Sequence, residues 1–165
     1  MPKVHVEADA PISADRVLAA ARDFTEHRAE LWPDVHLAQF RVHEIGDTYA
    51  DVTEGNPWPI GIVWERLRYD WSVPGSIRGV VIDSNLFYPG STWELYAAPT
   101  EGGSHVEIIA QRNLRPIKGW LTYPFFPLGI ARQTVAEHLH HFLSTVEGDV
   151  LLREDSWRAS RSCEG

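Results

Sequence analysis

Apolar and polar side chains alternate along residues 3–10, with valine and alanine on one side and charged or histidine residues on the other. A period of two separates the two faces of an extended segment, so this stretch is predicted to form a half-buried strand. Apolar residues then follow Ser13 at helical spacing, and a second helical pattern covers residues 25–32, ending at Pro33. We therefore expect two short helices after the first strand. The hydroxyl of Ser13 would cap the first, and the second would stop because the residue before a proline leaves the helical region.

The pattern then changes to short apolar runs that are separated by breaks rich in glycine, proline and asparagine. The runs cover residues 36–45, 48–54, 61–72, 76–84, 91–98 and 104–115. Breaks of this length join neighbouring antiparallel strands. The six runs therefore predict an antiparallel meander.

The longest helical pattern begins at Gly129 and runs to about Glu147. Its apolar positions recur at intervals of three and four, which predicts one face packed against the sheet. Gly148 is a suitable C-terminal cap. Residues 149–165 carry mixed charges without a period, so we expect a single domain over residues 1–148 followed by a loosely ordered tail.

The order of these elements predicts an α+β fold. One strand, two short helices, six strands and a long helix would give a seven-stranded antiparallel sheet with one apolar face. The long C-terminal helix is the element able to cover that face, and the sheet must curve to wrap around it. Because one helix cannot fill a strongly curved sheet of this width, a cavity between the sheet and the helix is expected.

Composition and charge narrow the possible functions. The 165 residues suit one domain, and 44% hydrophobic with 23% charged residues is the ordinary globular mixture. A net charge of -8 disfavours binding to nucleic acid and to anionic membrane surfaces. Cys163 is the single cysteine, so neither a disulfide framework nor a thiolate zinc site is expected within one chain. The sequence shows no signal-peptide pattern and no apolar run long enough for a membrane helix, so we expect a cytoplasmic protein without stable membrane insertion.

Four segments carry a resemblance to a known superfamily. They are residues 10–17 leading into the first helix, 64–69 on the central strand, the 102–107 hairpin and the 119–121 step into the last helix. In this order they resemble the helix-grip superfamily of START-like lipid-transfer domains, pollen-allergen proteins and polyketide cyclase/dehydrase proteins, over residues 3–148. The resemblance implies an apolar cavity that binds a hydrophobic molecule. It does not choose between a carrier and an enzyme, because one fold hosts many functions.

Strand connectivity predicts where such a cavity opens. In an antiparallel meander, alternate connections lie at the same end of the sheet. One end receives tight polar turns at residues 46–47, 73–75 and 100–103. The other end receives seven aromatic side chains, which are Trp32, Trp58, Phe87, Tyr88, Tyr123, Phe125 and Phe126. We interpret this aromatic end as the cavity mouth, with a plain cap over the core and a protein interface as the alternatives.

Histidines are frequent, but their spacing does not predict a metal site. The densest cluster covers residues 138–141, and Glu137 stands beside His138 rather than between two histidines at zinc-protease spacing. We interpret this segment as a solvated helix face with His138 at the edge of the apolar stripe. The sequence also lacks a nucleophile elbow, a phosphate-binding loop and a dinucleotide-binding glycine pattern, so we expect no metal, no cofactor and no covalent catalysis.

Polar residues on inward strand phases are the candidates for ligand contacts. On residues 61–72 the more apolar phase carries Glu65 and Tyr69 inward, and on the last strand Arg112 interrupts an apolar phase. An interior charge is unfavourable unless it is paired, so Arg112 is expected to meet Glu65 or Asp83. The alternatives are a structural network in the cavity wall and the opposite strand phase, which would leave these groups in solvent.

The predicted ligand-binding residues are Glu65, Tyr69, Asp83, Asn85, Trp93, Arg112, Trp58, Phe87, Phe126, Val135, His138 and Phe142. The first hypothesis is a module that binds a hydrophobic small molecule such as a lipid, a polyketide or an isoprenoid. The second is a polyketide cyclase/dehydratase-type enzyme in which Arg112 and Tyr69 polarise carbonyl oxygens while Glu65 or Asp83 exchanges protons. The third is a protein-interaction domain in which the cavity is filled.

Overall fold

The computed structural model describes residues 3–58, 61–115 and 128–162, with the side chains of the last helix described for residues 131–153. The elements in chain order are β1 (Lys3–Ala10), α1 (Ala14–Ala21), α2 (Arg28–Leu31), the 3-10 turn η1 (Leu37–Gln39), β2 (Arg41–Ile45), β3 (Tyr49–Trp58), β4 (Gly61–Asp70), β5 (Ser76–Ser84), β6 (Thr92–Thr100), β7 (Gly103–Gln111) and α4 (Leu128–Ser162). This order confirms the predicted α+β arrangement.

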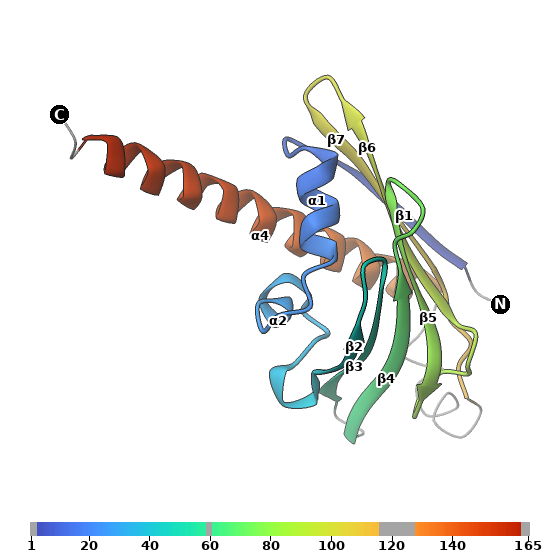
Figure 1. Ribbon diagram of the computed structural model, residues 1–165. Helices are drawn as coiled ribbons and strands as arrows, with labels where there is room; N and C mark the ends of the chain where they lie inside the picture. The colour runs from blue at the N-terminus through green and yellow to red at the C-terminus, as the bar shows by residue number, and fades with distance from the viewer. Residues whose placement is uncertain (1–2, 59–60, 116–127, 163–165) are drawn as a thin grey trace.

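The strands form one seven-stranded sheet in the order β1-β7-β6-β5-β4-β3-β2, and every neighbouring pair is antiparallel. The six later strands are the predicted meander, and β1 joins it at the β7 edge, with Lys3 opposite Gln111 and Ala10 opposite Ser104. The sheet is curved, and α4 crosses its concave side (Figure 1). α4 packs against β1, α1 and α2.

The core lies between the concave face and the helices. Along β7 the burial alternates residue by residue, so that Val106, Ile108 and Ala110 face inward. α4 presents Leu139 and Phe142 to them, in the stripe spaced by three and four that its sequence predicts. α1 covers β5, β6 and β7 near one end of the sheet and so fills part of the concave face.

An aromatic layer bounds this packed region. The Trp32 ring stacks on the Phe142 ring at 4.4 Å between centroids, and it also makes a T-shaped contact with Trp93 at 5.3 Å. Trp32 follows α2 directly, so the short helix positions this ring beneath α4. Space that is not filled by α1, α2 and this layer remains at the opposite end of the sheet.

The last helix does not end where its sequence predicts. Gly148 is the expected cap, but α4 continues to Ser162. A glycine inside a helix disfavours it by only about 1 kcal/mol, and no proline follows to stop the helix. The division into a domain over residues 1–148 and a tail over 149–165 stays a prediction. Among the described residues, no helix is both long and apolar enough to cross a membrane.

The short elements near the N-terminus also differ in detail. Ser13 occupies the N-cap of α1, but its side chain makes no capping hydrogen bond. The second helix is limited to Arg28–Leu31, because Asp23 accepts hydrogen bonds from both the backbone amide and the hydroxyl of Thr25 and so holds a turn before it. β2 begins only at Arg41, because the His36 side chain accepts a hydrogen bond from Ala38 and caps η1 instead.

Candidate ligand-binding cavity

A cavity of about 850 Å³ lies between the sheet and the first described turns of α4. Five aromatic side chains contribute to its wall: Trp32, Trp58, Trp64, Phe87 and Trp93. Aliphatic residues from β1, β4, β7 and α4 fill the rest, with a smaller number of polar groups between them. Ligand sites in proteins combine this volume range with a mostly apolar lining and a few placed polar groups.

The cavity lies at the sheet end to which the connectivity assigns the aromatic residues. Trp58 ends β3 and Phe87 follows β5, and both line the cavity. Backbone pairing of Phe87 with Leu114 holds this connection against the segment that follows β7. Phe126, the third mouth residue in the predicted set, lies outside the described residues.

Arg112 and Glu65 form an ion pair in the cavity wall, with Arg112 Nη1 donating to a carboxylate oxygen of Glu65. Their side chains are 23% and 15% exposed. Glu65 lies on β4, whereas Arg112 directly follows β7, three strands away in the sheet. The regular ladder between β5 and β6 ends at Val80 and Thr92, and the two side chains meet near this end. The Arg112 guanidinium also lies over the Phe87 ring, 4.9 Å from its centroid.

This pair confirms the first of the two partners predicted for Arg112 and sets the charge state of both groups. Burial raises the pKa of the Glu65 carboxyl, the nearby Arg112 opposes it, and the net direction is upward. For Arg112, burial lowers the pKa and Glu65 raises it, with a net increase, so the guanidinium stays charged. The wall therefore offers a fixed cation beside a carboxyl that takes up a proton more readily than an exposed one.

A second buried network lies beside the first. Arg28 of α2 is only 2% exposed, and its Nε donates to Glu54 on β3. Its Nη2 lies 3.0 Å from the Tyr69 hydroxyl, which itself donates to Glu54 Oε2 over 2.9 Å. The carbonyls of Ala21 and Asp23 accept from Nη1. Glu54 lines the cavity, while Arg28 and Tyr69 lie behind it.

This arrangement changes the role expected for Tyr69. The side chain faces inward as predicted, but its hydroxyl bonds to Glu54 and it does not line the cavity. Burial, and then the charge of Glu54, hold the pKa of Tyr69 well above its ordinary value. Tyr69 is therefore a neutral hydroxyl that positions Glu54 instead of a group directed at a ligand.

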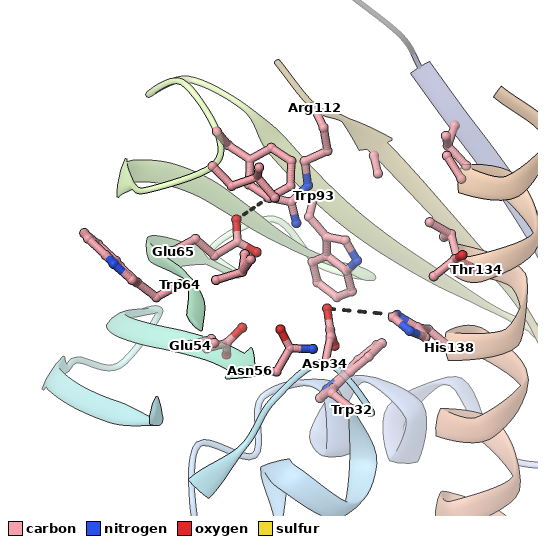
Figure 2. Close-up of a pocket in the computed structure, with 18 of the residues that line it drawn as sticks. Trp32, Asp34, Glu54, Asn56, Trp64, Glu65, Trp93, Arg112, Thr134 and His138 are labelled. Atoms are coloured by element: carbon pink, nitrogen blue, oxygen red, sulfur yellow. Dashed lines mark hydrogen bonds and ion pairs between the residues drawn. The ribbon is translucent and has the colours of Figure 1, made fainter. Parts of the chain in front are cut away.

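A third polar group faces the cavity from the opposite side. Asp34, two residues after Trp32, lies 3.9 Å from Nδ1 of His138 on α4. Asn56 on β3 points toward the same space, and Thr134 lies one turn before His138 (Figure 2). Among the described residues, no hydrogen bond to the Asn56 side chain is found, so its amide is available to a bound molecule.

Seven residues of the predicted set line the cavity: Trp58, Glu65, Phe87, Trp93, Arg112, Val135 and His138. Three others belong to the surrounding structure, in addition to Tyr69. The Asn85 side chain accepts from the backbone of Trp64 and donates to that of Ile62, which ties the turn after β5 to β4. Phe142 is fully buried under Trp32, one layer below the cavity.

The third is Asp83, for which the sequence predicts an inward side chain, and this is wrong. A β-bulge in the pairing of β4 with β5 places Arg66 opposite Asp83 but Leu67 opposite Val81. One extra residue inverts the side-chain phase of the strand, so Ser84 is buried and Asp83 is exposed. Asp83 lies 3.7 Å from Arg115, outside the cavity.

Four further residues of the site or its surroundings were not predicted from the sequence: Glu54, Asn56, Arg28 and Asp34. A signal existed for the first two, because Ala50, Val52, Glu54 and Asn56 share one phase of β3 and the first two are apolar. No comparable signal marks the other two. Arg28 lies in a helix of four residues, too short to show a period, and Asp34 lies in an irregular segment.

Comparison with known proteins finds likeness in structure and none in sequence. No protein-family model and no curated protein matches the chain. The protein TTHA0849 from Thermus thermophilus aligns with a TM-score of 0.74 and 17% identity, covering 90% of this chain and 99% of that one. A START superfamily protein from Mycobacterium smegmatis aligns at 0.65 and 12% identity, over 91% and 97% of the two chains. The Zhui aromatase/cyclase from Streptomyces sp. R1128 aligns at 0.60 and 16% identity, over 95% and 94%. The chain therefore has a START-like helix-grip fold.

Proposed function

We propose that the chain binds a hydrophobic small molecule, of lipid, polyketide or isoprenoid type, between the sheet and α4. The observation that carries this proposal is the cavity of about 850 Å³ with five aromatic side chains in its wall. A solid core at this place would have contradicted it, because ligand sites need roughly 300 Å³ or more. A protein-interaction domain with a filled interior is disfavoured for the same reason.

The polar groups in the cavity wall favour a ligand that is held in one orientation. The pair of Glu65 and Arg112 presents guanidinium N–H groups beside a carboxyl, and Asn56 presents an amide that can donate and accept. A ligand with one carbonyl or hydroxyl group would place that group here and its apolar part among the rings. Few polar contacts in an apolar site are enough to fix orientation.

A second candidate function is a cyclase or dehydratase acting on a polyketide-like substrate. The observation that favours it is the same pair, because an always charged donor beside a carboxyl of raised pKa suits general acid–base chemistry. Arg112 would polarise a carbonyl oxygen, and Glu65 would exchange a proton with the carbon or hydroxyl next to it. Tyr69 and Asp83 have no direct part in this version.

Native mass spectrometry of the purified protein tests the binding proposal. We expect a retained lipophilic compound, released on denaturation, and displacement of that compound by an added apolar ligand. Trp93→Ala should reduce retention because it removes a ring from the wall. The matched control is Trp71→Ala, which removes a ring outside the cavity lining. Absence of any bound or bindable apolar compound would contradict the proposal.

Glu65→Gln separates the two candidates. The amide keeps the shape of the side chain but cannot exchange a proton as a carboxyl does. A carrier should keep its binding of neutral ligands, whereas an enzyme of this mechanism should lose turnover of a poly-β-ketone substrate while still binding it.

A further inference from the structure

The charges that line the cavity do not cancel. Among the described lining residues, the charged side chains are Asp34, Glu54, Glu65 and Arg112. Glu65 is neutralised by Arg112 within the wall. Glu54 is neutralised from behind by the buried Arg28. Asp34 is the carboxylate that remains without a guanidinium or ammonium partner among the described residues.

Asp34 lies where a bound molecule would pass or rest. Its side chain points toward His138, and Trp32 and Trp93 line the same cavity (Figure 2). The distance to His138 Nδ1 is 3.9 Å, and half of the Asp34 side chain is exposed. Its charge also reaches the far wall, since it contributes to raising the pKa of both Glu65 and Arg112.

Among the described lining residues, an anionic ligand finds one guanidinium, Arg112, which is paired with Glu65, and one imidazole, His138, which lies 3.9 Å from Asp34. To reach the Arg112 guanidinium, a ligand carboxylate would have to displace Glu65 and leave it buried without its partner, or else approach it as a like charge. It would also face Asp34. A ligand ammonium, in contrast, finds the Asp34 carboxylate and the amide oxygen of Asn56 in a wall that also contains the indole rings of Trp32 and Trp93.

We propose that the cavity selects its ligand by charge: it prefers an apolar or aromatic molecule that carries a protonated amine, with Asp34 as the counter-ion, over the corresponding carboxylate. The proposal rests on the proposed ligand-binding function and narrows it to a chemical class. It also assigns Asp34, whose carboxylate lies 3.9 Å from His138 Nδ1 and has no guanidinium or ammonium partner among the described residues, as a specificity-determining residue.

Three probes of one shape test the proposal: 2-(aminomethyl)naphthalene, 2-naphthalenemethanol and 2-naphthoic acid. Affinities for the full chain are measured by isothermal titration calorimetry at about pH 7.5, where the amine is protonated and the acid is ionised. We expect the amine to bind most tightly and the acid at least roughly tenfold more weakly than the amine, since a partly exposed ion pair is gained in one case and like charges approach in the other.

Variants of the acidic residues locate the effect. Asp34→Asn should lower the affinity for the amine by roughly fivefold while leaving that for the alcohol unchanged. Asp47→Asn is the matched control, because it changes the net charge equally in the β2–β3 hairpin, away from the cavity lining. Glu65→Gln should improve binding of the acid, since it releases the Arg112 guanidinium.

The outcomes distinguish failure of the charge preference from failure of ligand binding itself. Equal affinities for the three probes, or equal effects of Asp34→Asn and Asp47→Asn, would overturn selection by charge and leave ligand binding in place. Tightest binding of the acid would overturn it as well. Failure of all three probes to bind would contradict the proposed function and this proposal with it.

Discussion

Replacing Arg112 by methionine tests whether the ion pair in the cavity wall is held away from water. Methionine keeps most of the apolar stem, so the main change is the loss of the guanidinium next to Glu65. Removing one partner of a fully buried pair costs about 3–5 kcal/mol, because the other charge stays behind unpaired. The Arg112 and Glu65 side chains are 23% and 15% exposed, so water can partly solvate the carboxylate that is left unpaired. We therefore expect Arg112→Met to lower the free energy of unfolding by about 2 kcal/mol near neutral pH.

The pH dependence of this loss has a definite sign. Burial already raises the pKa of Glu65, and Arg112 is the group that opposes the rise. In Arg112→Met the pKa of Glu65 therefore rises further, so the folded state gains a proton more readily than the unfolded state. The contribution of Glu65 to the stability of the variant is then most favourable at acidic pH and is lost as the pH rises through the pKa of Glu65 in the folded state. Relative to wild type, the variant should recover stability when the pH is lowered from about 7 to about 5.

Urea unfolding of four proteins measures both effects: wild type, Arg112→Met, Glu65→Gln and the double variant. The double variant has no charge left unpaired, so it should be less destabilised than Arg112→Met alone and should lose the recovery at acidic pH. If Arg112→Met and the double variant unfold alike at both pH values, the pair is solvated and the reasoning about the wall is refuted.

Four further variants test the packing. Tyr69→Phe should lower the free energy of unfolding by about 1–2 kcal/mol, because the hydroxyl loses its hydrogen bonds with Glu54 and Arg28. Ligand affinity should change little, since the ring does not line the cavity. Loss of binding with unchanged stability would contradict this. Phe142→Ala should lower the free energy of unfolding by about 3–5 kcal/mol in chemical unfolding. Trp58→Ser should instead mainly weaken or slow ligand exchange in stopped-flow assays. The reverse pattern would assign Trp58 to the core. His140→Ala should leave the melting temperature nearly unchanged because this side chain is exposed on α4, and a drop of several degrees would contradict the helix orientation.

Sequence patterns predict well where a strand is long and regular. The bounds of β1 and β5 coincide with the alternating runs 3–10 and 76–84, and the inward phases of β4 and β7 were enough to bring Glu65 and Arg112 together. Each strand there has one buried face, so the phase determines which side chains can meet. Asp83 shows the limit of this reasoning, because a single bulged residue inverted the phase and left no mark in the sequence.

The positions of Glu54 and Asp34 in the cavity depend on tertiary packing and not on the side-chain phase of a strand alone. Arg28 neutralises Glu54 only because α2, 26 residues earlier in the chain, packs on the concave side of the sheet next to α4. Asp34 reaches the cavity because Trp32 is fixed between Phe142 and Trp93. Neither position follows from a local period, so the charge balance of the site is visible only in the folded chain.

The pairing of β1 with β7 has a consequence for synthesis in the cell. β1 leaves the ribosome about 100 residues before the strand it pairs with, which at roughly 5–20 residues per second is a wait of about 5–20 s. During that time its unpaired edge could recruit strands from other nascent chains. Lys3, Glu7 and Asp9 place charges on one face of β1, a feature that discourages such pairing. The β1 edge is thus exposed to pairing with other chains until β7 has been synthesised.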